Sequence, residues 1–271
     1  MMLWIALISI ILFSIIIKSY YDTHFVKIER LDITTGKLEE NQSFTILQMT
    51  DLHNKQFNKG NQRLIDKIQS LDPDVIAITG DLIDRKTEDV EKALSFVEKI
   101  VEINPDTYFV SGNHEWGNPL HDVLFKGLEE RKVRHLDNQN TKLEVGEIRF
   151  QLAGIGDPST NHDSIEKALA GLDNNFFTVL LSHAPDVKEM PFPTPIDLTL
   201  SGHTHGGQIS LPLVGSLIAP DQGLFPKYDK GLYQLNDKQQ LYIDSGLGTS
   251  VIDARLFNQS QMTFITVKGE G

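Results

Sequence analysis

The chain of 271 residues contains no cysteine. This absence excludes disulfide bonds, thiolate zinc sites and a cysteine nucleophile. The G-x-S-x-G motif of a serine nucleophile elbow does not occur either. Positive charge is also scarce, with 25 Lys and Arg residues against 37 Asp and Glu residues and a net charge of −12. An acidic chain repels phosphate backbones, so no nucleic-acid partner is expected.

The N-terminal segment is a long apolar run. Residues 1–17 contain only two polar side chains, Ser9 and Ser14, and the aromatic pair Tyr20 and Tyr21 suits a membrane interface. The run predicts a helix of about 20 residues, enough to cross about 30 Å of hydrocarbon. We therefore expect a transmembrane anchor.

The expected anchor, residues 1–21, has one alternative, a cleaved signal peptide. No basic segment precedes the run and no A-x-A site follows it, which favours a single-pass protein of the cell membrane. Lys18, Lys27 and Arg30 follow the span and favour a cytoplasmic domain by the positive-inside rule. Three charges leave the side of the membrane open.

The rest of the chain predicts a connector, residues 22–43, and one α/β domain, residues 44–271. Apolar runs typical of strands alternate with helical spacing. Strands are expected near 44–49, 75–78, 108–110, 141–145, 147–154, 179–181 and 197–200, and helices near 64–71, 90–101, 119–130 and 165–172. After residue 207 the helical pattern stops, and an antiparallel pair is expected from 231–235 and 239–244.

Five polar clusters lie at the ends of the strand-like runs, where an open α/β sheet places its functional site. They are Asp51-Leu52-His53, Gly80-Asp81, Gly112-Asn113-His114-Glu115, Ser182-His183 and Gly202-His203-Thr204-His205. Each offers nitrogen or oxygen ligands without thiolate, a set that suits Mn, Fe or Zn ions better than a closed structural zinc site.

Each cluster alone has an ordinary structural explanation, such as an exposed loop, a turn or the start of a helix. Together and in this order, they favour two metal ions held side by side. Asp51 and His53 can chelate one ion, and a carboxylate such as Asp81 can bridge two. The pair His203 and His205 can serve one ion each.

These motifs resemble those of the calcineurin-like metallophosphoesterase superfamily, over about residues 44–268. The resemblance implies a four-layer sandwich of two mixed β-sheets flanked by helices. It also implies roles for the polar residues. Asp51, His53 and His205 would bind the first ion, Asn113, His183 and His203 the second, and Asp81 both, while His114 would act on the phosphate without binding metal.

Longer motifs resemble one branch of the superfamily, bacterial phosphodiesterases that often carry an N-terminal anchor or export signal. The motifs are residues 202–208, 230–233 and 246–250. Some members of that branch hydrolyse the pyrophosphate of a UDP-linked lipid A precursor. This chain has Ile243-Asp244-Ser245 where relatives tend to have Ser-Arg, Asn258-Gln259-Ser260 where they have a proline-containing segment, and no twin-arginine motif.

Two residues keep alternative interpretations. Arg255 either replaces the missing arginine at the substrate or is a surface residue. Glu115 either orients His114 or a metal-bound histidine, or is a surface carboxylate.

The expected activity is hydrolysis of a phosphodiester or pyrophosphate. A hydroxide bridging two ions would attack phosphorus in line, and His114 would stabilise the transition state or protonate the leaving oxygen. Phospholipids or lipid-linked pyrophosphates fit an anchored domain, and soluble phosphoesters stay open. A non-catalytic anchored binding module and a hydrolase of C–N or C–O bonds are the alternatives; the complete ligand set argues against the first, and the asparagine ligand against the second.

Overall fold

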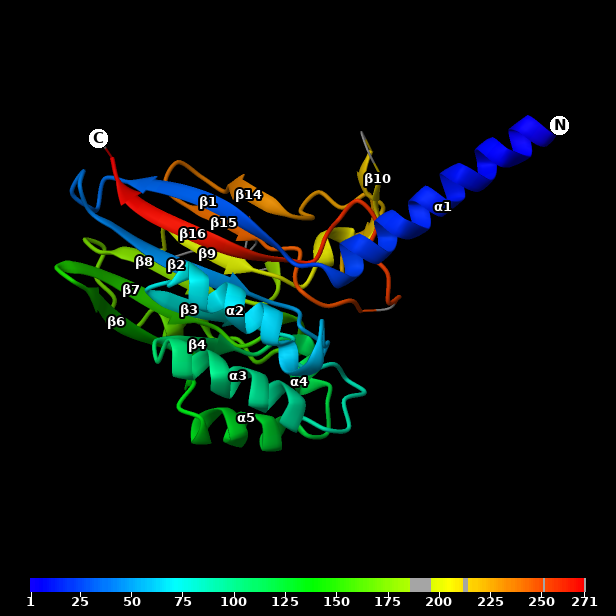
Figure 1. Ribbon diagram of the computed structural model, residues 1–271. Coiled ribbons are helices and arrows are strands. Elements are labelled where there is room, and N and C mark those ends of the chain that lie inside the picture. Colours follow the sequence, from blue (N-terminus) through cyan, green and yellow to red (C-terminus); the bar gives the residue numbers. More distant parts are fainter. Residues whose placement is uncertain (186–195, 212–213, 251, 271) are drawn as a thin grey trace.

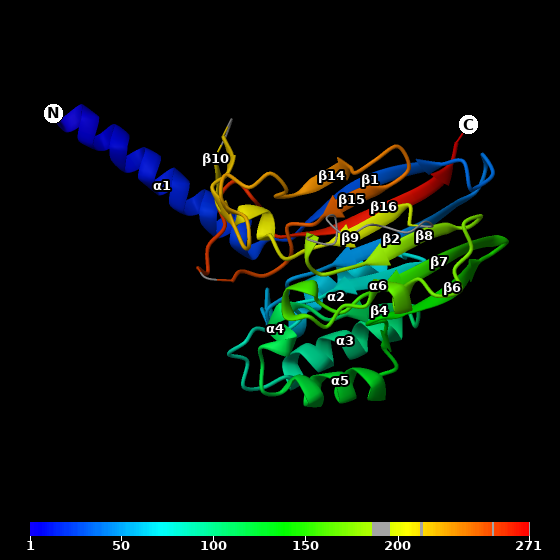
Figure 2. The same ribbon diagram turned by 180° about the vertical axis from the view of Figure 1, so that it is seen from behind.

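The computed structural model describes residues 1–185, 196–211, 214–250 and 252–270. Two six-stranded sheets face each other, and helices cover the outer faces (Figures 1 and 2). The described helices are α1 (Met2–His24), α2 (Gln62–Leu71), α3 (Glu91–Ile103), α4 (Asn113–Trp116), α5 (His121–Glu130) and α6 (Ile165–Ala168). This is the expected four-layer sandwich of two mixed β-sheets.

The first sheet has the strand order β1-β16-β2-β3-β4-β5. Its strands are β1 (Lys27–Thr35), β16 (Gln261–Gly269), β2 (Ser43–Met49), β3 (Val75–Thr79), β4 (Thr107–Val110) and β5 (Arg134–His135). Strands β2 to β5 are parallel, whereas β16 runs antiparallel to β2. The carboxyl ends of β2, β3 and β4 therefore meet at one edge.

The second sheet has the order β14-β15-β9-β8-β7-β6. Its strands are β14 (Gly231–Gln234), β15 (Gln240–Ile243), β9 (Leu198–Ser201), β8 (Phe177–Leu181), β7 (Ile148–Gly154) and β6 (Gln139–Val145). The middle strands β15, β9, β8 and β7 are parallel, and an antiparallel strand closes each edge. The expected hairpins β6–β7 and β14–β15 are confirmed.

The strands at the centre of the first sheet are apolar on both faces, because both faces are covered. In β4, Tyr108 and Val110 pack against the second sheet, while Phe109 packs under the helices. The helical side is completed by residues such as Leu64 of α2 and Val97 of α3. Each such side chain stabilises the fold by about 1.5–3 kcal/mol when fully buried. The resulting core holds the strand ends, and thus the polar clusters, in fixed positions.

The segment expected as a connector, residues 22–43, contains strand β1. This strand pairs in parallel with β16 from Lys27 to Thr35, so it belongs to the first sheet. The sequence did not predict it because a half-exposed edge strand alternates polar and apolar side chains and lacks the continuous apolar run of its buried neighbours.

Helix α1 is, among the described residues, the helix long and apolar enough to cross a membrane. It projects away from the sandwich, and its side chains up to Ile17 are exposed (Figure 1). Its last turn contacts the domain, since the Asp22 carbonyl accepts a hydrogen bond from Ser260 N–H at 2.8 Å and Thr23 Oγ1 accepts one from Arg255 N–H at 2.8 Å. The helix is thus attached to the domain without an intervening linker.

Helix α6 is shorter than expected, and the region between β9 and β14 contains hairpins that the sequence did not predict. The helix expected near 165–172 is a single turn, α6. Between β9 and β14 the chain forms short hairpins, β10 (Ser210–Leu211) with β11 (Gly215–Ser216) and β12 (Ile218–Ala219) with β13 (Gly223–Leu224). These hairpins stand beside the end of α1 in both views (Figures 1 and 2).

Candidate metal centre

The backbone at the strand ends adopts an unusual conformation. Five of the seven expected ligands have positive φ angles near the left-handed region, a conformation that non-glycine residues rarely adopt. They are Asp51 (52°), His53 (50°), Asp81 (53°), His203 (70°) and His205 (52°). Each such residue costs on the order of 1–3 kcal/mol, and strain of this kind concentrates at functional sites. The fold holds these side chains in place at an energetic cost.

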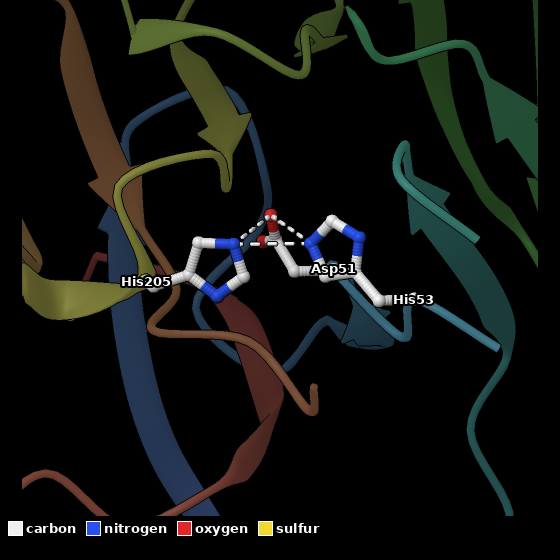
Figure 3. A group of neighbouring side chains, drawn as sticks. All are labelled: Asp51, His53 and His205. Atoms are coloured by element: carbon white, nitrogen blue, oxygen red, sulfur yellow. Dashed lines mark hydrogen bonds and ion pairs between the residues drawn. The ribbon is translucent and has the colours of Figure 1, made fainter. Parts of the chain in front are cut away.

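The first group consists of Asp51, His53 and His205, all buried (Figure 3). The Nε2 atoms of the two histidines lie 3.0 Å apart, and His205 Nε2 lies 3.4 Å from Asp51 Oδ1. Burial lowers the pKa of His53 to about 3 and that of His205 well below its usual range, so both rings are neutral. Lone pairs and a carboxylate oxygen therefore converge on one point.

The second group consists of His183, His203 and Asn113. His203 Nδ1 lies 3.2 Å from His183 Nε2 and 3.1 Å from Asn113 Oδ1. The opposite nitrogens are occupied, since His183 Nδ1 lies 2.8 Å from the Thr79 carbonyl and His203 Nε2 lies 2.7 Å from Asp221 Oδ2. Partners of this kind orient histidines that ligate metals.

Asp81 lies between the two groups. Its Oδ2 atom is 3.7 Å from His53 Nε2 and 3.1 Å from His183 Nε2. The structure therefore brings all seven expected ligands together, from both sheets. Asp51, Asp81 and Asn113 follow strands of the first sheet, and His183, His203 and His205 follow strands of the second.

The charges of the site call for cations. Among the described residues, no Lys or Arg side chain forms an ion pair with Asp51 or Asp81. Burial raises the pKa of Asp51 to about 6, because a charged carboxylate is unfavourable there. Burial also works against a charged His183, yet the adjacent Asp81 raises the pKa of that ring well above its usual range. The donor set thus fits two metal ions, which would supply the missing positive charge.

Two glycines leave room for the ligands. At Gly80, φ is 84° and an added Cβ would lie 2.6 Å from His183 Nδ1. At Gly202, an added Cβ would collide with Thr50 and come within 2.5 Å of Asp51 Oδ2. The glycines of the motifs are therefore required by close approach of the two sheets.

His114 lies at the rim of the groups, half-buried. Its backbone N–H donates to Asp81 Oδ1 at 2.9 Å, and its Nδ1 accepts from Arg85 N–H at 3.3 Å. This contact leaves the ring proton on Nε2. Burial lowers the pKa of His114, so the neutral ring with its Nε2–H predominates near pH 7. Its distance to His53 and Asp81 also permits metal binding on geometric grounds.

Glu115 is completely buried, so its interpretation as a surface carboxylate is wrong. Its Oε2 accepts from Asp81 N–H and Gly112 N–H, both at 2.8 Å, and its Oε1 accepts from Ile83 N–H at 3.1 Å. The carboxylate therefore holds the backbone that carries Asp81, rather than a histidine ring.

Replacing Glu115 by Gln should destabilise the protein. The amide NH₂ would face a backbone N–H donor, and one unsatisfied buried donor costs about 1–3 kcal/mol. Thermal unfolding of the full chain in detergent measures the effect. Glu129→Gln, an exposed position on α5, is the matched control and should leave the melting temperature unchanged. Equal melting temperatures for both variants would contradict the buried role.

Arg255 is also completely buried, so it is not a surface residue. Its guanidinium donates to the Gly248 carbonyl at 2.6 and 2.9 Å and to the Ser245 carbonyl at 2.6 Å. These contacts hold the turn that packs on Asp51, where Gly248 N–H donates to the Asp51 carbonyl at 2.5 Å. Arg255 therefore helps to fix the position of Asp51 indirectly, through the backbone of Gly248.

Two residues of the site, Asp221 and Arg85, were not predicted from the sequence. Asp221 reaches His203 from the β12–β13 hairpin, and the exposed Arg85 lines the same cavity as His114. Arg85 stands four residues after Asp81 on the same loop, but no sequence motif marked it. No signal in the sequence pointed to Asp221, because its hairpin returns to the site only in three dimensions.

A cavity of about 690 Å³ opens beside the metal groups. Its polar wall includes Asp81, Asn113, His114 and His203. Its apolar lining includes Ile209, Leu217, Ile218, Ala219 and Ile252. This lining suits a ligand that has both a charged group, which the metal groups can bind, and an apolar portion.

Comparison with known proteins agrees with this geometry. The model of the calcineurin-like phosphoesterase family matches residues 44–207, more than half of the chain. The chain belongs to the calcineurin-like phosphoesterase family. Members of this family use a binuclear metal site.

The relatives of this calcineurin-like phosphoesterase include bacterial and animal proteins. It is 30% identical to the uncharacterized metallophosphoesterase YkoQ of Bacillus subtilis, covering 91% of this chain and 92% of that protein. It is 30% identical to the uncharacterized metallophosphoesterase Cj0846 of Campylobacter jejuni, covering 90% of this chain but 64% of that protein. A transmembrane protein with metallophosphoesterase domain from Danio rerio is 30% identical, over 76% of this chain and 48% of that protein.

Among solved structures, a 5′-nucleotidase precursor from Thermus thermophilus is similar over 84% of this chain and 54% of that chain. The TM-score is 0.49 and the sequence identity 14%.

Proposed function

We propose that this calcineurin-like phosphoesterase hydrolyses phosphodiesters or pyrophosphates with two metal ions, Mn, Fe or Zn. The observation that carries the proposal is the convergence of two buried ligand groups on Asp81. Asp51, His53 and His205 would hold one ion, Asn113, His183 and His203 the other, and Asp81 both. When bound, the pair supplies an activated water and neutralises charge on the phosphoryl oxygens.

The residues of the chain prepare the site for that chemistry. Asp221 and the Thr79 carbonyl orient His203 and His183, and Glu115 and Arg255 fix the loops that carry Asp81 and Asp51. The neutral ring of His114 would donate a hydrogen bond from its Nε2–H to a bound phosphoester and stabilise the transition state, and its protonated form, which burial disfavours by lowering the pKa, would protonate the leaving oxygen. Arg85, exposed at the cavity, attracts the anionic substrate.

We further propose that α1 anchors the protein in the cell membrane as a single-pass helix. Its length, its exposed apolar surface and the transmembrane naming of the Danio rerio relative support this. An anchored enzyme with an apolar cavity wall favours a substrate with a lipid part, such as a phospholipid or a lipid-linked pyrophosphate.

The first test is metal-dependent turnover. The full chain, purified in detergent and stripped by a chelator, should be inactive on bis(p-nitrophenyl) phosphate and regain activity when Mn²⁺ is added. Metal content is measured on the same samples. Two tightly bound ions with no turnover of any phosphoester would instead support a non-catalytic binding module.

A further inference from the structure

Exposed apolar side chains gather on the hairpins between β9 and β14. We call the described residues 209–211 and 214–225 the apolar arm. Leu224 is 72% exposed, Phe225 64% and Val214 57%, and Leu211 and Ile218 are exposed as well. Ile252 of the neighbouring loop adds another exposed side chain. Exposed apolar side chains gathered on one short stretch of chain are typical of an interaction surface.

The apolar arm is joined to the end of α1 through one loop. Ser210 N–H donates to the Leu256 carbonyl at 2.9 Å, and the next residue back, Arg255, donates its N–H to Thr23 of α1 at 2.8 Å. Lys18 of α1 lies 5.7 Å above the ring of Phe257. The C-terminal end of α1, this loop and the arm are therefore neighbours in the structure.

The arm and α1 also project to the same side of the molecule. Both views show the β10 hairpin rising from the end of the sandwich at which α1 leaves it (Figures 1 and 2). Helix α5 lies at the opposite side of the sandwich in both views. In a bilayer crossed by α1, the arm therefore lies closer to the lipid than the helices that cover the first sheet.

The arm is part of the catalytic cavity as well. Ile218 and Ile252 are exposed and also line the cavity, and Asp221, between β12 and β13, contacts His203. One hairpin therefore connects the exposed apolar surface to a metal ligand. A partner or membrane that binds the arm at Ile218 and Ile252 would therefore lie at the mouth of the cavity.

We propose that the apolar arm and Ile252 form a second membrane contact, inserting into the headgroup–acyl boundary of the bilayer that α1 crosses. The mouth of the cavity then opens at the membrane surface, where the phosphate of an amphiphilic ester reaches the metals while its apolar part stays against Ile218 and Ile252. Lys227, exposed two residues after Phe225, adds attraction to anionic headgroups. The contact rests on the membrane anchoring by α1, but not on the hydrolytic reaction.

The absence of cysteine makes a direct test simple, because each single-cysteine variant has one labelling site. Leu224→Cys probes the arm, Ile10→Cys probes the middle of α1, and Val123→Cys is the matched control, an apolar residue 54% exposed on α5. Each full-length variant is labelled with an environment-sensitive dye and placed in nanodiscs of phosphatidylcholine and phosphatidylglycerol, with or without bromine on the acyl chains.

Bromine should quench the dye at Leu224 at least about twofold, since interfacial residues sit about 5–10 Å into the headgroup boundary. The dye at Ile10 should be quenched more and the dye at Val123 hardly at all. Quenching at Ile10, with Leu224 equal to Val123, would overturn the second contact and leave the anchor intact. No quenching at Ile10 would overturn both, while the metal-dependent turnover would be unaffected.

A second copy of the chain is the other occupant that the arm could accept. In that case the dye at Leu224 becomes shielded in detergent as the protein concentration rises, and brominated lipid does not quench it. This result would also overturn the membrane contact.

Discussion

Asp81→Asn should lower phosphodiester hydrolysis by roughly a thousandfold, because metal ions contribute several kcal/mol to such reactions. Asp81 Oδ2 lies within 3.7 Å of His53 Nε2 and 3.1 Å of His183 Nε2, so it is the carboxylate shared by the two ligand groups. An amide carries no charge and binds one ion through its single oxygen. The variant should therefore lose one ion and bind the other weakly, as measured by metal analysis after dialysis.

The control for this substitution is Asp66→Asn on α2, an exposed carboxylate that accepts a hydrogen bond from Gln62. It should keep full activity and metal content. If Asp81→Asn retains two tightly bound ions, Asp81 does not bridge them and the assignment of the site is wrong.

His114→Ala should slow hydrolysis by about 10²- to 10⁴-fold for diphenyl phosphate and by much less for bis(p-nitrophenyl) phosphate. The protonated ring of His114, a minor form near pH 7 because burial lowers its pKa, can give a proton to the departing oxygen and return to the neutral ring. Phenoxide needs that proton more than the stabilised p-nitrophenoxide does. Turnover of both diesters by the same metal-loaded enzyme measures the ratio.

Metal content decides between the roles open to His114. Its ring lies close enough to His53 and Asp81 to bind an ion, so loss of an ion in His114→Ala would reassign it as a ligand. Equal losses on both diesters with intact metals would exclude the acid and leave stabilisation of the transition state. His162→Ala, an exposed histidine stacked on Trp116, is the control and should behave like the native chain.

Much of the fold was predictable because buried strands and amphipathic helices have distinct periods. The run Val75–Thr79 and the helical face of Leu94 and Val97 are determined locally, by side chains that must all be buried. Strand β1 was not predictable, since its partner β16 lies more than 230 residues away and its own pattern is that of an exposed edge. The short hairpins of the apolar arm have no period at all.

The candidate ligands were predictable for a different reason. Strand ends place side chains at one edge of a sheet, so Asp51, Asp81 and Asn113 had to be neighbours once their strands were parallel. The roles of Glu115 and Arg255 depended on burial, which a single charged residue after a turn does not reveal. Both act through backbone atoms: Glu115 binds N–H groups of the loop that carries Asp81, 32 and 34 residues away, and Arg255 binds the Gly248 carbonyl seven residues away.

The sequence by itself determined the family, the alternating α/β architecture, the seven ligand-type residues and the apolar N-terminal helix. Each of these depends on a short motif or on the local spacing of apolar residues. The tertiary structure alone decided how the two sheets meet, that Asp81 stands between the two histidine groups, and that Asp221 reaches His203. It also decided that the apolar arm lies beside α1. These are contacts between segments far apart in the chain, and only the packing of both sheets brings them together.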